Sequence, residues 1–424
     1  MSRNLVKKSV LAGALPLALI LTGCGGGVGE SSGGDAGSGF EFGAPQEEVD
    51  AAIADLEPVT LAYQPYAPSQ NSTSAPSALA FMEAVEERSG GKISFDVSWA
   101  QAIAPYPEVD DALADGRLDL AFAVPIYYVA EYPMTDAYNK LSYFTPGTPM
   151  VGEAALQAQM AEAGWNDPNV LQQFEDQSVT PLNPLVGSGT YWTACGEEGT
   201  AREDLQGSQI RIGGAVQTPI SQALGASPVS MEYHEAFEAL QRGTVDCMFT
   251  QGLVAGSTGL VEAAPHLSAF DGDERFTGAV TAAFIAGAGY ESLPLAYKQI
   301  IFDAAGIDWQ HGWMHSNLES SAQATADAVE HGGSFTATDE ETKQIILDTQ
   351  TEIADQMIAD GVVSEEVRAG LEESGPRWMQ TLADLGYEEG GDVSELHEWY
   401  DPETDFRPLF EEAFNAGAVD HRPA

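Results

Sequence analysis

The sequence predicts an α/β protein built from two domains, followed by a helical extension at its C-terminal end. Strand-like and helix-like segments alternate in residues 59–124 and again in residues 209–249, and this rhythm is typical of sheets built from strand–helix–strand units. A length of 424 residues corresponds to about two domains. Hydrophobic residues make up 44% of the chain, which is enough to supply a core for each.

In the first unit, β-branched and aromatic residues predict strands, and apolar residues at helical spacing predict the helices between them. Glycines end both helices. The order of the elements favours a mostly parallel sheet. The expected elements are a strand at 59–63, a helix at 75–89, a strand at 93–97, a helix at 108–114 and a strand at 118–124.

The second unit repeats this order, and a mainly helical region follows it. The expected elements of the unit are a strand at 209–212, a helix at 218–224, an extended segment at 229–233, a helix at 235–240 and a strand at 244–249. Residues 278–289 are small and apolar, and we expect them to return the chain to the first domain. Later helices are expected at 296–305, 315–329, 340–360, 364–373 and 376–385.

The N-terminal segment has the layout of a secretory signal. Three basic residues precede an apolar run at 10–21, which is too short to span a bilayer. The Leu-Thr-Gly-Cys sequence that ends at Cys24 is similar to the bacterial lipoprotein lipobox, which implies removal of residues 1–23 and lipidation of Cys24. The alternative is an ordinary signal peptide with an incidental cysteine. Residues 24–57 are expected to be the lipidated cysteine and a flexible tether rich in Gly, Ser and acidic residues.

Charge and cysteine content exclude several classes of function. The net charge of −48 argues against nucleic acid as a partner and against electrostatic docking on anionic lipid. The membrane is therefore expected to be reached through the lipid anchor only. Three cysteines are too few for a disulfide-stapled scaffold. Cys195 and Cys247 could form a disulfide outside the cytoplasm, or both could be small buried hydrophobes.

Three ordered blocks of sequence resemble the DctP-type solute-binding proteins of TRAP (tripartite ATP-independent periplasmic) transporters. The resemblance covers about residues 58–305, and its blocks lie at 81–121, 203–246 and 291–294. It implies a periplasmic-binding-protein-like fold with a hinge and a ligand cleft between two domains. It also implies a protein that is not an enzyme, has no cofactor, and delivers a small organic acid to the membrane subunits of a TRAP transporter. The expected location is extracytoplasmic, on the outer face of the cell membrane, or periplasmic if an outer membrane is present.

The chain is expected to cross between the two domains more than once. Domain I is predicted from residues 58–185 and about 276–312, and domain II from residues 186–275 and about 313–424. The C-terminal helices are assigned to domain II in this division.

Arg211 is the leading candidate for ligand binding. It lies in the strand after Asp204-Leu205-Gln206-Gly207, where the resemblance implies an arginine that grips the ligand carboxylate; a guanidinium fits a carboxylate with two parallel hydrogen bonds. The alternative is a surface arginine paired with one of the 65 acidic residues. Residues 187–193 contain no second cation, and Thr250 and Gln251 stand where relatives often have Asn. A monocarboxylate or zwitterion is therefore expected.

Aromatic and amide residues near the ends of predicted strands complete the expected site. Ligands of open α/β sheets bind beyond the carboxyl ends of the strands. The candidates of this kind are Tyr66, Trp99, Gln101, Tyr127, Trp192 and Tyr233.

Two other classes of protein compete with this interpretation. A substrate-binding lipoprotein of an ATP-driven importer would share the anchor and the two-domain fold. A secreted lipoprotein hydrolase would need a nucleophile or a metal site, and the sequence has neither a Gly-x-Ser-x-Gly elbow nor His-Glu-x-x-His. His311 and His315 would share one helix face, but without an acidic ligand at a matching place they predict no metal site.

Overall fold

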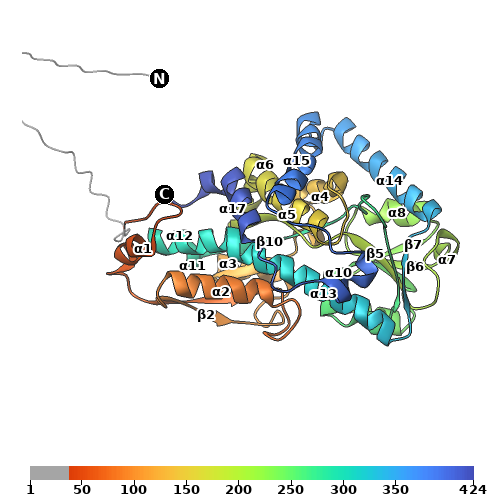
Figure 1. Ribbon diagram of the computed structural model, residues 1–424, viewed down its shortest axis with the longest axis horizontal. Helices are drawn as coiled ribbons and strands as arrows, with labels where there is room; N and C mark the ends of the chain where they lie inside the picture. Colours follow the sequence, from red (N-terminus) through yellow and green to blue (C-terminus); the bar gives the residue numbers. More distant parts are fainter. Residues whose placement is uncertain (1–37) are drawn as a thin grey trace, which may run out of the picture. The chain divides into compact units, whose positions relative to one another are not determined.

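The computed structural model describes residues 38–424, and two β-sheets organise this part of the chain (Figure 1). The predicted signal segment at 1–23 and the predicted lipidation site Cys24 lie outside the described residues. None of the helices within residues 38–424 combines the length and the hydrophobicity that a membrane crossing requires.

The first sheet contains the strands of the first predicted unit and two further strands. Its order is β2-β1-β3-β10-β4, with β1 (Val59–Gln64), β2 (Ile93–Val97), β3 (Leu120–Ala123), β4 (Thr180–Gly187) and β10 (Val280–Ala286). β1 is parallel to β2 and β3, whereas β10 is antiparallel to β3 and β4. The expectation of a mostly parallel sheet is confirmed, because β1, β2, β3 and β4 run in the same direction, and only the returning segment β10 enters the sheet as an antiparallel strand.

The second sheet has the order β11-β9-β5-β8-β6-β7. Its strands are β5 (Tyr191–Cys195), β6 (Gln209–Ile212), β7 (Ser227–Ser230), β8 (Cys247–Gln251), β9 (His266–Ala269) and β11 (Ser334–Ala337). β6 is parallel to β7 and β8, while β5 is antiparallel to β8 and β9. The extended segment expected at 229–233 ends earlier, since Tyr233 already begins a helix.

Helices follow the strands of each sheet along the chain. Around the first sheet these are α2 (Pro76–Arg88), α3 (Val109–Ala114), α4 (Pro133–Lys140), α5 (Val151–Asn166), α6 (Pro168–Asp176) and α11 (Ala288–Glu291). Between the strands of the second sheet lie α7 (Arg202–Leu205), α8 (Gln217–Ala223), α9 (Tyr233–Gln241) and α10 (Gly252–Ser257).

One continuous helical run connects the two sheets. It consists of α12 (Leu295–Ala304), a π-helical stretch at 305–309 and α13 (Gln310–Glu330), where the sequence predicts two separate helices. α13 packs against both α2 and α10. Trp309, the last residue of the π-helical stretch, stacks on Phe284 of β10 and on Trp313 of α13. These aromatic contacts connect the π-helical stretch to the first sheet and to the next turn of the helix.

The C-terminal extension consists of α14 (Glu340–Ala359), α15 (Glu365–Asp384), α16 (Leu396–Trp399) and α17 (Arg407–Ala416). α15 continues through Pro376, although the sequence predicts a break there. Proline removes one backbone donor, and the carbonyl that loses its partner belongs to Glu372, an exposed residue. α15 and α17 pack on α5, which belongs to the predicted domain I, whereas the sequence assigns the C-terminal helices to domain II.

Part of the predicted tether is folded. Residues 46–53 form α1 (Gln46–Ile53), and Phe40 is 8% exposed. Arg422 donates to the Phe40 carbonyl at 2.7 Å, and Phe42 stacks on Phe414 of α17. Phe40 and Phe42 therefore pack against the C-terminal end of the chain. The Gly- and Ser-rich composition around them does not predict this contact.

Candidate ligand-binding site

Arg211 lies on β6, a strand whose register is fixed on both sides. Arg211 pairs with Val229 of β7 and with Met248 of β8. At the start of β6, the Asp246 carboxylate accepts a hydrogen bond of 2.7 Å from the Gln209 amide. The first sheet uses the same device, because Asp119 accepts from the Ala62 amide at 2.7 Å. Each aspartate therefore anchors a neighbouring strand, which accounts for the acidic residue in both resembling blocks.

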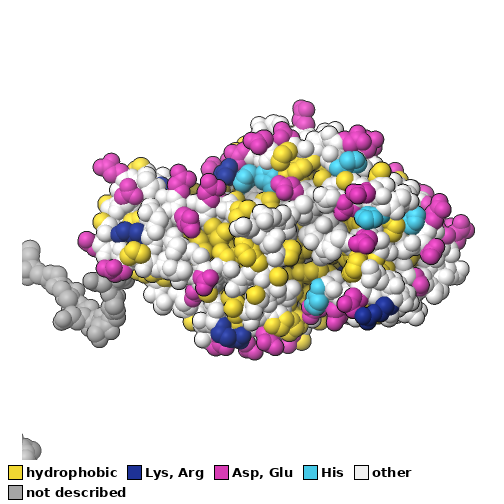
Figure 2. All heavy atoms as spheres, turned by 90° about the horizontal axis from the view of Figure 1, so that it is seen from below, with side chains coloured by type: hydrophobic (Ala, Val, Ile, Leu, Met, Phe, Trp, Pro, Cys, Tyr) yellow, Lys and Arg dark blue, Asp and Glu magenta, His cyan; other side chains and the backbone are white. Residues whose placement is uncertain are grey.

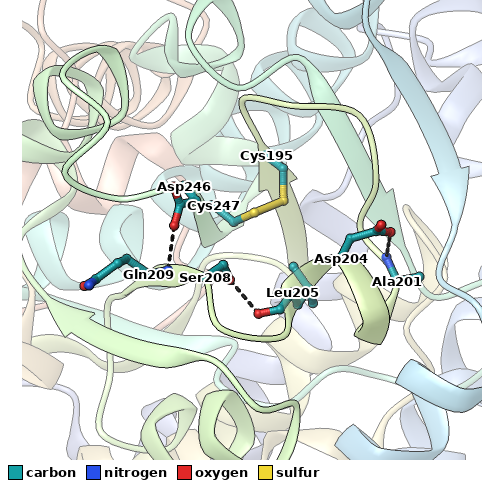
Figure 3. Close-up of a disulfide and its surroundings, with 8 residues drawn as sticks. All are labelled: Cys195, Ala201, Asp204, Leu205, Ser208, Gln209, Asp246 and Cys247. Carbon is teal, nitrogen blue, oxygen red and sulfur yellow. Dashed lines mark hydrogen bonds between the residues drawn. A yellow bond between two sulfur atoms is a disulfide. The ribbon is translucent and has the colours of Figure 1, made fainter.

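A disulfide connects a strand that precedes Arg211 in the sequence to a strand that follows it. Cys195 at the end of β5 is bonded to Cys247 at the start of β8 (Figure 3). The bond thus encloses the loop and the strand that carry Arg211. The same close-up shows two contacts that shape the chain before β6, from the Ala201 amide to Asp204 and from the Ser208 hydroxyl to the Leu205 carbonyl.

The guanidinium of Arg211 is buried and has no acidic partner. Arg211 is 3% exposed. Its Nε donates to the Met231 carbonyl at 3.0 Å and its Nη1 to the Phe249 carbonyl at 3.4 Å. No carboxylate of residues 38–424 lies within ion-pair distance of it. A buried charge without a counter-ion is costly.

Gly213 makes room for the guanidinium. A Cβ atom at this position would lie 3.0 Å from Nη1 and 3.3 Å from Nη2 of Arg211. These distances are shorter than side chains normally tolerate, so any larger residue would displace the two terminal nitrogens. The absence of a side chain at Gly213 therefore lets both terminal nitrogens occupy their observed positions.

Arg211 lines a cavity of about 30 Å³ that lies between the two sheets. Arg211 is the one charged residue among those that line it. The others are Tyr66, Phe122, Val124, Ile126, Tyr127, Ser188, Tyr191, Gly213, Tyr233, Gln251, Leu253, Val254 and Thr281. This volume accommodates a water molecule but not an organic acid. Entry of a ligand therefore requires the two sides of the cavity to move apart.

Tyrosine hydroxyls close the cavity across the two sheets. Tyr66, which follows β1, shares a hydrogen bond of 3.1 Å with Ser257 of α10. Tyr106 shares one of 2.9 Å with Tyr233, the first residue of α9. The Tyr127 hydroxyl accepts from the Tyr233 amide at 3.3 Å. Aromatic contacts accompany these hydrogen bonds, because the ring centroid of Tyr233 lies 5.9 Å from that of Tyr66 and 6.1 Å from that of Tyr106.

Burial keeps the tyrosines of the cavity neutral. It raises the pKa of Tyr66 and of Tyr127, and it raises the pKa of Tyr191 to about 12 although the Arg211 charge acts in the opposite direction. Neutral hydroxyls can donate to an anion at any physiological pH. The buried Gln251 amide adds a further donor, because its Nε2 has no hydrogen-bond partner among residues 38–424.

The structure brings five of the predicted residues together and leaves four outside the cavity. Those that line it are Arg211, Tyr66, Tyr127, Tyr233 and Gln251. Trp192 and Thr250 are paired with each other on the face of β5 and β8 that is opposite to the face of Tyr191 and Gln251, and neither of them lines the cavity. Trp99 packs half-buried on the core of the first sheet. Gln101 accepts a hydrogen bond from the Tyr106 amide at 3.3 Å and so contacts the partner of the cavity residue Tyr233.

Several residues that line the cavity were not predicted. Tyr191 occupies the face of β5 that the sequence assigns to Trp192, and it pairs with Gln251 of β8. Phe122 of β3 and Thr281 of β10 come from buried strands. The alternation of side chains along strands was the available signal. If Gln251 of β8 faces the cavity, the residue paired with it on the neighbouring strand faces the cavity too, and that residue is Tyr191.

Comparison with known proteins places this arrangement among extracytoplasmic binding proteins. The model of the family "Bacterial extracellular solute-binding protein, family 7" (DctP) matches residues 65–360. A solute-binding protein from Sulfitobacter sp. is 23% identical over 299 residues, which cover 68% of this chain and 84% of the relative.

Solved structures show the same fold at low sequence identity. A TRAP solute-binding protein from Rhodoferax ferrireducens in complex with copurified benzoate has a TM-score of 0.64 and 21% identity, covering 76% of this chain and 99% of the other. The sugar acid binding protein of Advenella mimigardefordensis in complex with galactonate has a TM-score of 0.61 and 18% identity, covering 76% of this chain and 100% of the other.

Proposed function

The chain belongs to the DctP family of bacterial extracellular solute-binding proteins, and we propose that it captures a small organic monocarboxylate whose carboxylate pairs with Arg211. The observation that carries the proposal is the buried guanidinium without an acidic partner, placed against the cavity between the two sheets. A carboxylate would use the free edge of the guanidinium in two parallel hydrogen bonds.

The composition of the cavity wall supports a single carboxylate and an apolar ligand body. The wall contains one cation, so a second carboxylate would be buried without a counter-ion. Aromatic and aliphatic side chains form most of the remaining surface. The complexes of similar structures with benzoate and with galactonate show that proteins of this fold accept acids with different bodies.

The acidic surface makes the buried arginine more important. On the face shown in Figure 2, Asp and Glu side chains are spread over the surface, while Lys and Arg appear in few places. With a net charge of −48, the protein repels anions at long range. The energy that retains an anionic ligand must therefore come from short-range contacts with Arg211 and the neutral donors around it.

Binding is coupled to closure of the cleft. In the open form, an acid reaches Arg211, and Tyr233 and Gln251 add hydrogen bonds. Tyr66 and Tyr106 then meet their partners on the other side, as the hydrogen bonds between the two sheets indicate. The ligand favours closure only to the extent that it binds the closed form more tightly. The closed protein then delivers the acid to the membrane subunits of a TRAP transporter, held near the membrane by lipid on Cys24.

The test is a thermal-shift screen that compares each monocarboxylate, benzoate included, with its uncharged amide. At 100 times its dissociation constant, a ligand adds about 2.7 kcal/mol to the free energy of unfolding. We expect acids and not amides to stabilise the protein. Arg211→Met should remove the response, and the exposed Arg117→Met should keep it. Equal stabilisation by amides, or a full response in Arg211→Met, would contradict the proposal.

A further inference from the structure

A second and larger cavity lies beside Trp192, on the face of β5 opposite to Tyr191. Its volume is about 390 Å³, within the range of small-molecule sites. Trp192 lines it, whereas the preceding residue Tyr191 lines the Arg211 cavity. The two cavities are therefore separated by the thickness of β5, and a molecule in one does not occupy the other.

The C-terminal extension covers this second cavity. Residues 389–396, between α15 and α16, contribute a large part of its wall. The Glu389 carboxylate accepts hydrogen bonds from the Met150 and Val151 amides at 3.1 and 3.0 Å, which ties this segment to the start of α5. The model of the family ends at residue 360. The covering segment is thus an addition of this chain to the part that the family model describes.

Two buried acceptors face the same point of the cavity wall. Asn317 of α13 is 6% exposed, and its Nδ2 donates to the Trp313 carbonyl at 2.8 Å. This contact fixes the orientation of the amide, and Oδ1 has no hydrogen-bond partner in the described part of the chain. Glu153 of α5 is 7% exposed, and its Oε1 accepts from Arg275 and from the Thr190 amide.

Both acceptors lie near the backbone at Gly189. A Cβ atom at Gly189 would lie 3.7 Å from Asn317 Oδ1 and 4.0 Å from Glu153 Oε2. Gly189, Asn317 and Glu153 all line the cavity. Two acceptors that converge on one place call for a ligand with at least two N–H or O–H donors.

The charge of the wall selects a cation among such donors. Acidic residues line the cavity, and no lysine or arginine is among the lining residues. Arg275 neutralises Glu153 from behind, and Lys343 contacts Asp271 at 3.3 Å. Glu389 and Asp392 have no basic partner within residues 38–424. The cavity therefore has the opposite charge preference to the one that contains Arg211.

Aromatic rings provide a surface for the body of the ligand. Trp192 and Phe335 of β11 meet edge to face with their centroids 5.0 Å apart. Gly252 leaves room for the indole, since a Cβ atom at this position would lie 2.5 Å from the ring of Trp192. Aromatic faces attract ammonium groups and pack well against apolar carbon.

We propose that this second cavity binds a small organic ammonium compound. Its N–H groups bind Asn317 Oδ1 and Glu153 Oε2, and its carbon body packs on Trp192 and Phe335. The site is independent of the proposed capture of an acid by Arg211. Because its wall comes from α5, α13, the second sheet and the extension, an occupant fixes the extension against the rest of the molecule.

Isothermal titration of the full-length protein with benzylamine tests the proposal. Benzyl alcohol is the uncharged control, and benzyltrimethylammonium is a cation without N–H groups. We expect saturable binding of benzylamine with a dissociation constant below about 1 mM. Both controls should bind at least about 10-fold more weakly, because each lacks one of the two recognised features.

Three variants locate the binding. Asn317→Leu should weaken benzylamine at least about 10-fold by removing an acceptor, and Ala337→Trp should abolish binding by filling the mouth of the cavity at an exposed residue. Val329→Trp, at a residue that is 69% exposed and outside the cavity, is the matched control and should bind normally. Arg211→Met should also keep the affinity.

Four results would overturn the proposal: no saturable heat from benzylamine, equal binding of either control compound, unchanged binding in both cavity variants, or loss of binding in Arg211→Met. The last result would place the amine in the other cavity. None of them bears on acid binding, which is measured separately with benzoate.

Discussion

Two arginines of this protein are equally buried and have opposite surroundings. Arg275 is 1% exposed, and its Nη1 donates to Glu153 at 2.8 Å. Its other nitrogens donate to the carbonyls of Thr145, Pro146 and Gly152 at 3.2, 2.6 and 3.0 Å. Arg211, 3% exposed, has two carbonyl partners and no acid among the described residues. Burial alone therefore does not identify a functional arginine, whereas an unfilled set of donors does.

The largest expected effect is on stability, at Arg275. Arg275→Met should lower the free energy of unfolding by about 3–5 kcal/mol, because it leaves the buried Glu153 carboxylate without its counter-ion. Equilibrium urea unfolding measures the loss. The double variant with Glu153→Gln should recover part of it, since the charge left behind is removed. A loss below about 1 kcal/mol would mean that the ion pair between Arg275 and Glu153 does not stabilise the fold.

A smaller effect is expected on ligand affinity when the guanidinium of Arg211 is replaced by an ammonium group, which has the same charge and a different geometry. Arg211→Lys should weaken the best-binding monocarboxylate by about 10- to 30-fold, because an ammonium cannot form two parallel hydrogen bonds with a carboxylate. Titration calorimetry of wild type and variant measures the ratio. An unchanged affinity would indicate that charge alone retains the ligand and that the fork geometry at Gly213 is irrelevant.

His311 is a partly buried basic side chain that, unlike the two arginines, can be neutral at physiological pH. Burial, with help from His315 and Arg407 and against the nearby Asp405, lowers the pKa of His311 from 6.5 to about 4. The unfolded chain therefore binds more protons than the folded one between these values, and stability falls as the pH is lowered from 6.5 to 4. Since the ring is partly screened by solvent, we expect a loss of about 1–2 kcal/mol.

The pH dependence of the melting temperature in His311→Asn checks this effect. Asparagine keeps an acceptor for the Phe406 amide, which binds His311 Nδ1 at 3.2 Å, but it does not titrate. The variant should lose less stability than wild type between pH 6.5 and 4, and the exposed His331→Asn should behave as wild type. Identical acid profiles for wild type and His311→Asn would refute the assignment.

The smallest expected effect is that of pH on acid binding. A guanidinium is not deprotonated in this range, and burial raises the pKa of Tyr127 and of Tyr191. The affinity for a monocarboxylate should therefore change less than about twofold between pH 6 and 9. Calorimetric titrations across this range measure it. A marked fall in affinity near pH 8 would show that a group other than these controls the site.

Local patterns predicted the elements whose residues carry their own signal. The alternation in β1, β2 and β6 and the helical spacing in α2 and α14 correspond to strands and helices in the structure. β5 and β10 are buried along their whole length, so no polar alternation marks them. Pro376 led to a break in α15 that does not exist, because the carbonyl it leaves unpaired belongs to an exposed residue.

The site was predictable only where a motif marks it. Arg211 follows a recognisable block, whereas the partner that makes Arg275 structural, Glu153, lies 122 residues away in the chain. Trp192 and Thr250 were expected in the cavity because sequence does not show which face of a strand points inward. The family of the chain is extracellular, whereas the lipid anchor at Cys24 and attachment to the outer face of the cell membrane stay predictions.

The central claim is that Arg211 contributes to binding and not to the stability of the ligand-free protein. Equilibrium urea unfolding of Arg211→Met, without and with the best-binding monocarboxylate, tests it most directly. Without ligand, we predict a free energy of unfolding within about 1 kcal/mol of wild type, because removing an unpaired buried charge offsets the lost hydrogen bonds. With ligand, the wild type should gain stability and the variant should not. A loss of about 3 kcal/mol without ligand, or an equal gain with it, would contradict the claim.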